Sequence, residues 1–428
     1  MKPLILPLVI VLLVRSSIAA AISESLADGT ARIGASSGQS PNLVFMTSVT
    51  GTGNLNSWPE AQALTGLEAG DQICRTVAAA ANLPEPSTFV AWLSDDSDDA
   101  YCRVHGLTGK VSDDCGQGSI PVDAGPWVRT DGFPFAPTID RLVSGEILAP
   151  IRFDENGNST SFWHAWTGST DGGSVSVITC DNWTDPGSGQ GTLGYKFGTA
   201  RAWTLGGSGG CGLTRHLYCF HPGPGADLPP FTSPGRIAFV TSDSGTGDLG
   251  SWPGIDPGGQ DPGLETGDAI CRARASAAGL ANPNSFVAWL SDDSTAAIDR
   301  LVHDGPWVRP DGVLLASNKA DLADGDLFTA ISVDEFGAYV PLSGAWTGTD
   351  EQGLTLVGEH CLGWTSDSGG QIGRRGSSAH ANPWWTEYLT TETCQNSLRL
   401  YCLEDTQFFL FADGFESGDT AVWSSSVP

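Results

Sequence analysis

The chain has 428 residues, enough for two or three domains that each bury a core. Lys and Arg number 21 against 49 Asp and Glu, which gives a formal net charge of -28. Such an acidic surface repels phosphate backbones and anionic lipids, so nucleic acid is not expected as a partner. The 55 glycines and 15 tryptophans are typical of short strands and ordered loops rather than of a helical bundle.

The first 21 residues predict a secretory signal peptide. Lys2 precedes an apolar run over 4–14 that is too short to span a bilayer, and small residues follow at 19–21. Residues 22–41 are expected to link this leader to the first domain, and no later segment has the apolar length of a membrane span. We therefore expect a secreted, acidic protein whose ten cysteines lie where disulfide bonds can form.

Most of the remaining chain is one unit written twice. The stretch FVAWLSDDS stands at Phe89 and returns unchanged at Phe286, and motifs on both sides of it recur in the same order. The repetition predicts tandem domains over 42–220, the first repeat, and 236–405, the second repeat. The segment between them, 221–235, is rich in Pro and Gly and is expected to be a semi-stiff linker that would permit bivalent binding.

Within each repeat the pattern predicts a helix followed by a buried strand. Asp71 and Asp268 suit the N-cap of these helices, and Asn82 and Gly279 suit their C-terminal ends. The FVAWL sequence is apolar on both faces, which predicts a central buried strand. Short strands separated by Gly turns complete each unit, so the predicted fold class is α+β.

The second half of the motif, SDDS, is the best candidate for chemistry. Each copy carries adjacent carboxylates, and the four residues are Asp95, Asp96, Asp292 and Asp293. We favour a structural role in which they cap the next helix, expected over 295–302 in the second repeat. Calcium coordination is the alternative, and no other cofactor is expected. Arg300 is expected to pair with one of these carboxylates.

Cysteine positions indicate two stapled units. The offset between repeats falls from 197 to 180 after the shared motif, so the first repeat holds 17 additional residues there. Cys102 and Cys115 lie within this insertion, and we infer that they bridge each other. The second repeat has four cysteines, which allow three connectivities.

Several of the repeated motifs resemble the endostatin domain at the end of collagens XV and XVIII. They are FVAWLS, the WTG at Trp166 and Trp346, the CxxWT at Cys180 and Cys361, and the closing LYC. They are still more similar to a bacterial family of secreted endostatin-like domains of unknown function. The resemblance covers both repeats and implies a C-type-lectin-like fold with nested disulfides. The pairs it implies are Cys74–Cys219, Cys180–Cys211, Cys271–Cys402 and Cys361–Cys394.

The known activities of these relatives do not transfer with the fold. The chain has no arginine cluster of the kind with which endostatin binds heparin, so heparin binding is not expected. The N-terminal histidine cluster of the endostatin zinc site is also absent from the sequence. The EPN, QPD and WND motifs of calcium-dependent lectins do not occur either.

Other residues imitate known sites but have simpler interpretations. Ser208 formally fits a nucleophile elbow, but we favour a glycine loop. Asp243 fits an aspartic-protease motif, but we favour a polar turn. The segment 154–158 resembles a calcium loop, but we favour a hairpin. His164, His216 and His360 are expected to form ordinary hydrogen bonds. Of the tryptophans, Trp92, Trp166, Trp289 and Trp346 are expected in the core. Those near polar loops, where sugar stacking is conceivable, are Trp163, Trp203, Trp384 and Trp385.

The tail over 406–428 contains FADGFESGD, which resembles a short C-terminal segment of exported Gram-negative proteins and implies sorting or retention at a bacterial cell surface. The sequence as a whole predicts a secreted or surface-retained, non-enzymatic binding protein whose tandem lectin-like modules recognise a glycan or protein ligand. The alternatives are a secreted hydrolase with a carboxylate site borne on a loop, and a purely structural component of an envelope or matrix.

Overall fold

The computed structural model describes residues 41–160, 162–253, 255 and 263–406. The predicted signal peptide, the N-terminal linker and the tail lie outside these residues except at positions 41 and 406. In the part of the chain that is described, no helix combines the length and the apolar character needed to cross a membrane.

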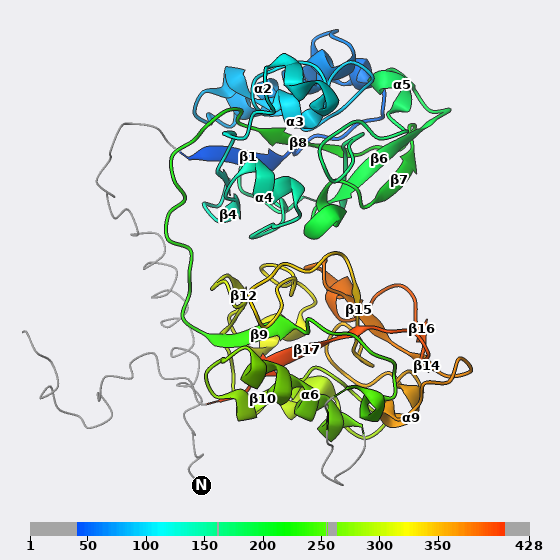
Figure 1. Cartoon of the computed structure of the whole chain (residues 1–428). Helices are drawn as coiled ribbons and strands as arrows, with labels where there is room; N and C mark the ends of the chain where they lie inside the picture. Colours follow the sequence, from blue (N-terminus) through cyan, green and yellow to red (C-terminus); the bar gives the residue numbers. More distant parts are fainter. Residues whose placement is uncertain (1–40, 161, 254, 256–262, 407–428) are drawn as a thin grey trace, which may run out of the picture. The chain divides into compact units, whose positions relative to one another are not determined.

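The first repeat is built on an eight-stranded mixed sheet in the order β4-β3-β1-β8-β5-β6-β7, with β2 also pairing with β8 (Figure 1). The strands are β1 (Asn42–Met46), β2 (Val90–Ala91), β3 (Trp127–Arg129), β4 (Pro134–Ala136), β5 (His164–Trp166), β6 (Gln190–Tyr195), β7 (Gly207–Gly210) and β8 (His216–Phe220). The first and last strands, β1 and β8, run antiparallel with Phe45 opposite Cys219. The two ends of the repeat therefore meet in the middle of the sheet.

The second repeat has a seven-stranded sheet in the order β12-β11-β9-β17-β13-β15, with β10 on β17. Its strands, with the separate pair β14 and β16, are β9 (Arg236–Val240), β10 (Phe286–Ala288), β11 (Trp307–Val308), β12 (Leu314–Ala316), β13 (Gly344–Trp346), β14 (Ile372–Gly373), β15 (Arg375–Ser377), β16 (Glu392–Thr393) and β17 (Arg399–Glu404). Each strand of this sheet takes the place of its sequence counterpart in the first repeat. The predicted α+β class is thus confirmed.

Helices are few and mostly short. The α-helical segments are α2 (Gly66–Ala80), α3 (Ala100–Arg103), α4 (Ile139–Val143), α5 (Cys180–Trp183), α6 (Leu264–Ala277), α7 (Ala297–Arg300), α8 (Lys319–Ala323) and α9 (Cys361–Trp364). Single 3-10 turns complete the described elements: η1 (Leu55–Ser57), η2 (Pro59–Ala61), η3 (Pro86–Thr88), η4 (Val111–Gly116), η5 (Ala200–Trp203), η6 (Leu249–Ser251), η7 (Pro283–Ser285) and η8 (Pro383–Trp385). Only α2 and α6 have the length of ordinary helices among these residues.

The predicted N-caps of α2 and α6 are wrong. Both helices begin more than a turn earlier, so that Asp71 and Asp268 lie inside them. The carboxylate of Asp268 is used in tertiary contacts instead: Oδ1 accepts from the Ala288 backbone N–H at 2.9 Å and from Arg300 Nη2 at 2.6 Å. The predicted partner of Arg300 is therefore also wrong. The helix ends agree with expectation, since Asn82 takes a φ of 56° just beyond α2.

The FVAWL strand is buried on both faces, as its sequence predicts. In the first repeat, Val90 and Trp92 belong to one apolar cluster, while Phe89, Ala91 and Leu93 belong to the cluster across the sheet. Its position is not central, however, because the only strand with which β2 pairs among the described residues is β8. Helix α2 covers the face that holds Phe89, so packing against the helix buries that face without a second hydrogen-bonded neighbour.

Five disulfides staple the two repeats: the one inferred from the insertion in the first repeat, and the four that the resemblance to endostatin implies. The bonds are Cys74–Cys219, Cys102–Cys115, Cys180–Cys211, Cys271–Cys402 and Cys361–Cys394. No free cysteine occurs among the described residues. Disulfides in this number are typical of proteins that mature in an oxidising compartment outside the cytoplasm.

Equivalent segments of the two repeats contact each other reciprocally. Thr199 N donates to Ala379 O at 2.7 Å, and Ala381 N donates to Phe197 O at 2.9 Å. Thr199 and Ala381 are 182 positions apart, as are Phe197 and Ala379, and the same offset relates Trp203 to Trp385. Each bond is therefore the counterpart of the other in the opposite repeat. The contact ties the repeats together directly, so they are joined by more than the linker over 221–235.

Candidate functional site

The first aspartate of each SDDS motif shapes its own turn. Asp292 Oδ1 accepts from the backbone N–H groups of Ser294 and Thr295 at 2.8 and 2.9 Å, and from the Ser294 hydroxyl at 2.8 Å. Asp95 does the same in the first repeat. The helix that follows begins at Ala297 rather than at 295, and its first N–H is accepted by the Ser291 hydroxyl at 2.8 Å. The serine hydroxyl therefore caps the helix, whereas the aspartate closes the turn before it, so the predicted capping of the helix by the aspartate is wrong.

A left-handed turn lies against this motif in both repeats. All four residues of α9 have φ between 49° and 68°, including Cys361 and Leu362. For residues other than Gly and Asn this conformation costs roughly 1–2 kcal/mol each. Two attachments hold α9 in place: the disulfide from Cys361 to Cys394, and the Trp364 indole N–H, which donates to Ser291 O at 2.9 Å.

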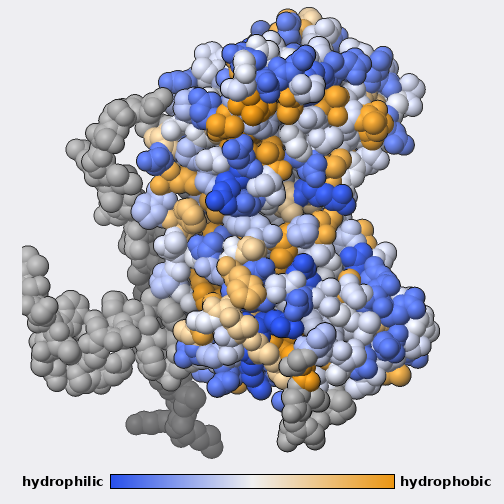
Figure 2. All heavy atoms as spheres, viewed as in Figure 1, coloured by the Kyte–Doolittle hydropathy of each residue, from blue (hydrophilic) through white to orange (hydrophobic). Residues whose placement is uncertain are grey.

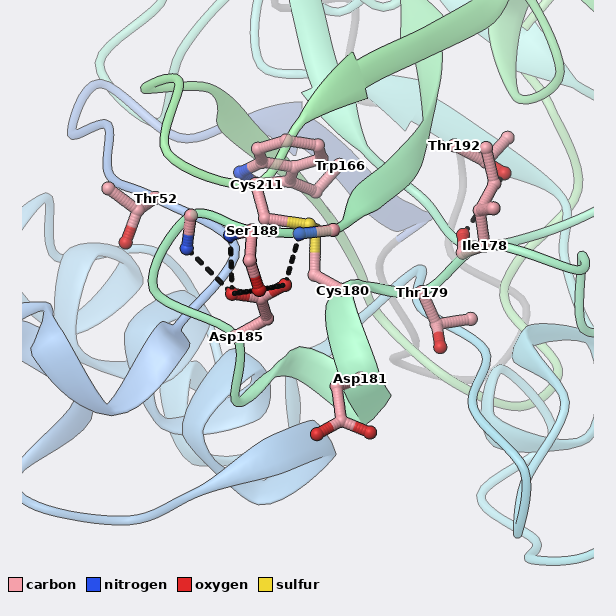
Figure 3. Close-up of a disulfide and its surroundings, with 12 residues drawn as sticks. Thr52, Trp166, Ile178, Thr179, Cys180, Asp181, Asp185, Ser188, Thr192 and Cys211 are labelled. Carbon is pink, nitrogen blue, oxygen red and sulfur yellow. Dashed lines mark hydrogen bonds between the residues drawn. A yellow bond between two sulfur atoms is a disulfide. The ribbon is translucent and has the colours of Figure 1, made fainter.

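The corresponding turn of the first repeat, α5, is shown in Figure 3. Cys180 is bonded to Cys211, and the Asp181 side chain points away from the disulfide. Asp185 accepts hydrogen bonds from the backbone N–H groups that follow it, and these lower the pKa of its carboxyl group. Asp185 thus closes the loop that follows the strained turn. Both α5 and α9 thus lie against an SDDS motif and are each held by a disulfide.

The second aspartate of the motif meets different partners in the two repeats. Asn182, on α5, closes over Asp96: its Nδ2 donates to Asp96 Oδ2 at 3.0 Å, and its Oδ1 accepts from Asp96 N at 3.2 Å. The residue at the position of Asn182 in the second repeat is Gly363, which has no side chain to reach Asp293. A Cβ built on Gly363 would meet no heavy atom within 4 Å.

An open hollow of about 350 Å³ lies at this place in the second repeat. The hollow is defined by its lining residues, which are Asp292, Asp293, Ser294, His360, Leu362 and Gly363. Two of these residues, Leu362 and Gly363, belong to α9, which is labelled in Figure 1. Leu362 is 59% exposed here, an unusual state for leucine at a strained backbone position.

His360 forms the floor of the hollow and is only 6% exposed. Its Nδ1 accepts from the Gly363 backbone N–H at 2.7 Å, so the proton of the neutral ring is carried by Nε2. Nε2 lies 2.8 Å from Asp293 Oδ1, a polar contact that is not aligned as a hydrogen bond. The imidazole and the Gly358 N–H together hold the pKa of Asp293 below its ordinary value, so this carboxylate is charged at neutral pH.

The calcium alternative finds no coordination sphere at these aspartates. Oxygen Oδ1 of both Asp95 and Asp292 is spent on backbone N–H groups, and Asp96 is clamped by Asn182. Throughout the described ranges, no group of three or more His, Cys, Asp or Glu side chains is arranged to hold a metal ion. The four aspartates thus act as turn caps or as walls of the hollow.

The other imitations of known sites also have structural roles, although the glycine loop expected at Ser208 is wrong. Ser208 lies in strand β7 opposite Thr192, not at a turn between strand and helix. Asp243 pairs with Arg274 at 2.8 Å. Asp154 Oδ1 accepts from Asn156 N and Asn158 N, both at 2.8 Å, which closes the predicted hairpin.

The tryptophans divide differently from the prediction. The four expected in the core are buried: Trp92, Trp166, Trp289 and Trp346. Trp203 and Trp385 are buried as well, so a sugar ring cannot reach them. Trp163 is 40% exposed, and its ring stands nearly perpendicular to that of Trp384, with centroids 5.6 Å apart. None of these residues lines the hollow.

Sequence reasoning missed a pair of buried glutamates. Glu335 accepts from Ser242 N at 2.9 Å and from the Ser242 hydroxyl at 2.5 Å, and Glu155 contacts Ser48 in the same way. Each glutamate follows the aspartate of the hairpin and fixes the end of the first strand of its repeat. Their occurrence at matching positions of both repeats was the signal that could have found them.

Buried histidines should make the protein less stable in mild acid. Burial lowers the pKa of His216 from 6.5 to about 4, while its Nδ1 donates to Thr47 O at 2.6 Å. Between these two pH values the unfolded chain binds the proton and the folded chain does not. Stability is therefore complete above pH 6.5 and falls as the pH drops toward 4, by up to ~1.4 kcal/mol per pH unit for this group.

His216→Asn keeps a donor for Thr47 O but does not titrate. We expect its unfolding free energy, measured by guanidinium titration between pH 7.5 and 4.5, to decline less steeply than that of the wild type. His380, whose pKa is likewise lowered to about 4 by burial, would keep its share of the slope in both proteins. Parallel pH profiles for variant and wild type would contradict the assignment.

Comparison with models of known protein families and with curated proteins finds no match to this chain.

Proposed function

We propose that the protein is an extracellular, non-enzymatic binding protein and that the hollow of the second repeat is its ligand site. The observation that carries this proposal is the hollow itself, where Gly363 occupies the position at which the first repeat has Asn182 bonded to Asp96. Rigid support favours binding, because a site whose groups are already positioned loses little entropy when the ligand arrives. The endostatin-like, C-type-lectin-like fold remains part of this proposal.

Binding is favoured over hydrolysis by the state of His360. Its Nδ1 lone pair accepts the Gly363 N–H, and its Nε2 proton faces Asp293, so no free lone pair is offered as a general base. The hydroxyl of Ser294 is held by Asp292 at 2.8 Å rather than by the imidazole. This arrangement lacks the base-to-nucleophile bond on which acyl transfer depends.

The repeats are therefore proposed to differ in role. The sequence suggested two similar sites that gain avidity through the linker. With Asn182 closed over Asp96, we propose instead one ligand site per chain, carried by the second repeat. The first repeat would act as its structural partner through the reciprocal contact at Thr199 and Ala381.

Gly363→Asn is the sharpest test, since it places in the second repeat the residue that closes the first. Asparagine tolerates the φ of 68° better than other side chains, and its Cβ enters open space, so the fold should be retained. We expect the variant to lose binding to whichever ligand the wild type selects from glycan and peptide arrays. Circular dichroism would confirm that the variant is folded.

Gly337→Asn is a matched control for this experiment. It makes the same change at a φ of 82°, again with no atom within 4 Å of the new Cβ, but on a hairpin that does not line the hollow. The control should bind like the wild type. If Gly363→Asn bound every array ligand as tightly as Gly337→Asn, the hollow would not be the site.

A further inference from the structure

We infer that the hollow takes the side chain of a lysine or arginine residue from a basic segment of a partner protein. This inference rests on the proposed function and names its ligand class. It draws on four features of the hollow: unneutralised carboxylates, a buried donor, an exposed aliphatic wall and a small volume.

The carboxylates of Asp292 and Asp293 have no Lys or Arg partner among the described residues. Their Oδ1 atoms are engaged with backbone N–H groups or with His360, whereas no described hydrogen bond uses Oδ2 of either residue. Two acceptor oxygens and uncompensated negative charge thus remain on one wall. An ammonium or guanidinium group would satisfy both at once, through charge-assisted hydrogen bonds.

The buried imidazole adds a donor to this acidic wall. His360 Nε2 carries a proton and lies 2.8 Å from Asp293 Oδ1, although this contact is not aligned as a hydrogen bond. A lysine or arginine within a peptide supplies both complements, a cationic head for the carboxylates and a main-chain carbonyl for the imidazole.

Leu362 gives the hollow an aliphatic wall. Exposure of this leucine on a strained left-handed turn gains nothing for folding, yet it places a methyl-bearing surface beside the carboxylates. Lysine and arginine pack their long aliphatic stems along such surfaces while the charged head stays at the polar end. Sugar rings are usually held by stacking on aromatic faces, and no Trp, Tyr or Phe side chain lines the hollow.

Size and charge point the same way. A volume of about 350 Å³ is near the lower limit of roughly 300 Å³ for small-ligand sites, which suits one side chain better than an oligosaccharide. The net charge of -28 attracts cationic partners over long range and repels sulfated or phosphorylated ones. Strongly hydrophilic side chains are spread over the face of the molecule drawn in Figure 2.

The test is isothermal titration of the full-length protein with a short peptide of alternating lysine and glycine, in physiological salt. We expect one peptide per chain and at least tenfold weaker binding to Asp293→Asn. Gly363→Asn should abolish binding, and the control Gly337→Asn should leave it unchanged. The same peptide with acetylated lysines should not bind, because acetylation removes the charge.

Two results would overturn the inference. One is equal binding of the acetylated and unmodified peptides. The other is equal affinity of Gly363→Asn and Gly337→Asn for the lysine peptide. That result would show that the peptide binds through the overall negative charge of the protein and not in the hollow. If instead a neutral oligosaccharide binds and Gly363→Asn abolishes that binding, the ligand class assigned here is wrong while the binding site proposed above stands.

Discussion

Removing the Cys271–Cys402 disulfide is expected to lower the free energy of unfolding of the second repeat by roughly 5 kcal/mol. The bond closes a span of 131 residues, so its loss frees a long stretch of the unfolded chain. It also joins helix α6 to strand β17, in the middle of the sheet. The measurement is a guanidinium titration of Cys271→Ala/Cys402→Ala without reductant, followed by tryptophan fluorescence.

The Cys102–Cys115 bond provides the comparison. It closes only 13 residues, and the same chain-entropy relation gives roughly 3 kcal/mol for its removal. Cys102→Ala/Cys115→Ala should therefore be the milder double variant. Equal losses of stability would show that the span closed by each bond does not determine its contribution.

Asp268→Ala is expected to destabilise the second repeat by about 3–5 kcal/mol. The substitution leaves the guanidinium of Arg300 buried without the carboxylate that lies 2.6 Å away, and both side chains are less than one-tenth exposed. It also deprives the Ala288 N–H, at the FVAWL strand, of its acceptor. One side chain thus fixes α6 to both β10 and α7, and thermal or guanidinium unfolding would measure its loss.

Glu265→Ala is the matched control on the same helix, since Glu265 is exposed in the first turn of α6. We expect a change within about 0.5 kcal/mol for it. Adding Arg300→Met to Asp268→Ala should recover part of the stability, because it removes the unpaired buried charge. A double variant less stable than Asp268→Ala alone would contradict that explanation.

Local patterns predicted the parts of the fold that depend on local composition. The apolar run at Phe89 predicts burial wherever the strand lies, and the insertion around Cys102 predicts its own bridge. The same reasoning misplaced Asp71 and Asp268, because N-cap preference competes with tertiary demand. Each carboxylate lies inside its helix and pairs with an arginine 32 residues later in the chain. No local sequence pattern indicates a contact over that separation.

The hollow could be predicted only in part. The sequence singled out Asp292 and Asp293 but not what faces them, since Gly358 lies 65 residues away from Asp293 along the chain. A left-handed turn through Cys361 and Leu362 runs against the preference of both residues, and only the finished packing imposes it. The exchange of Asn182 for Gly363 is visible in an alignment of the two repeats, but its meaning depends on that turn.

The pairing of the first strand of each repeat with its last strand has a consequence for how such chains evolve. Phe45 lies opposite Cys219, and Phe239 lies opposite Cys402, so each unit starts and finishes at neighbouring points of its own sheet. A gene segment encoding one unit can be duplicated in frame without interrupting any sheet. Once the unit is duplicated, one copy is free to change at a position such as that of Asn182, while the other copy keeps the side chain that contacts its own SDDS motif.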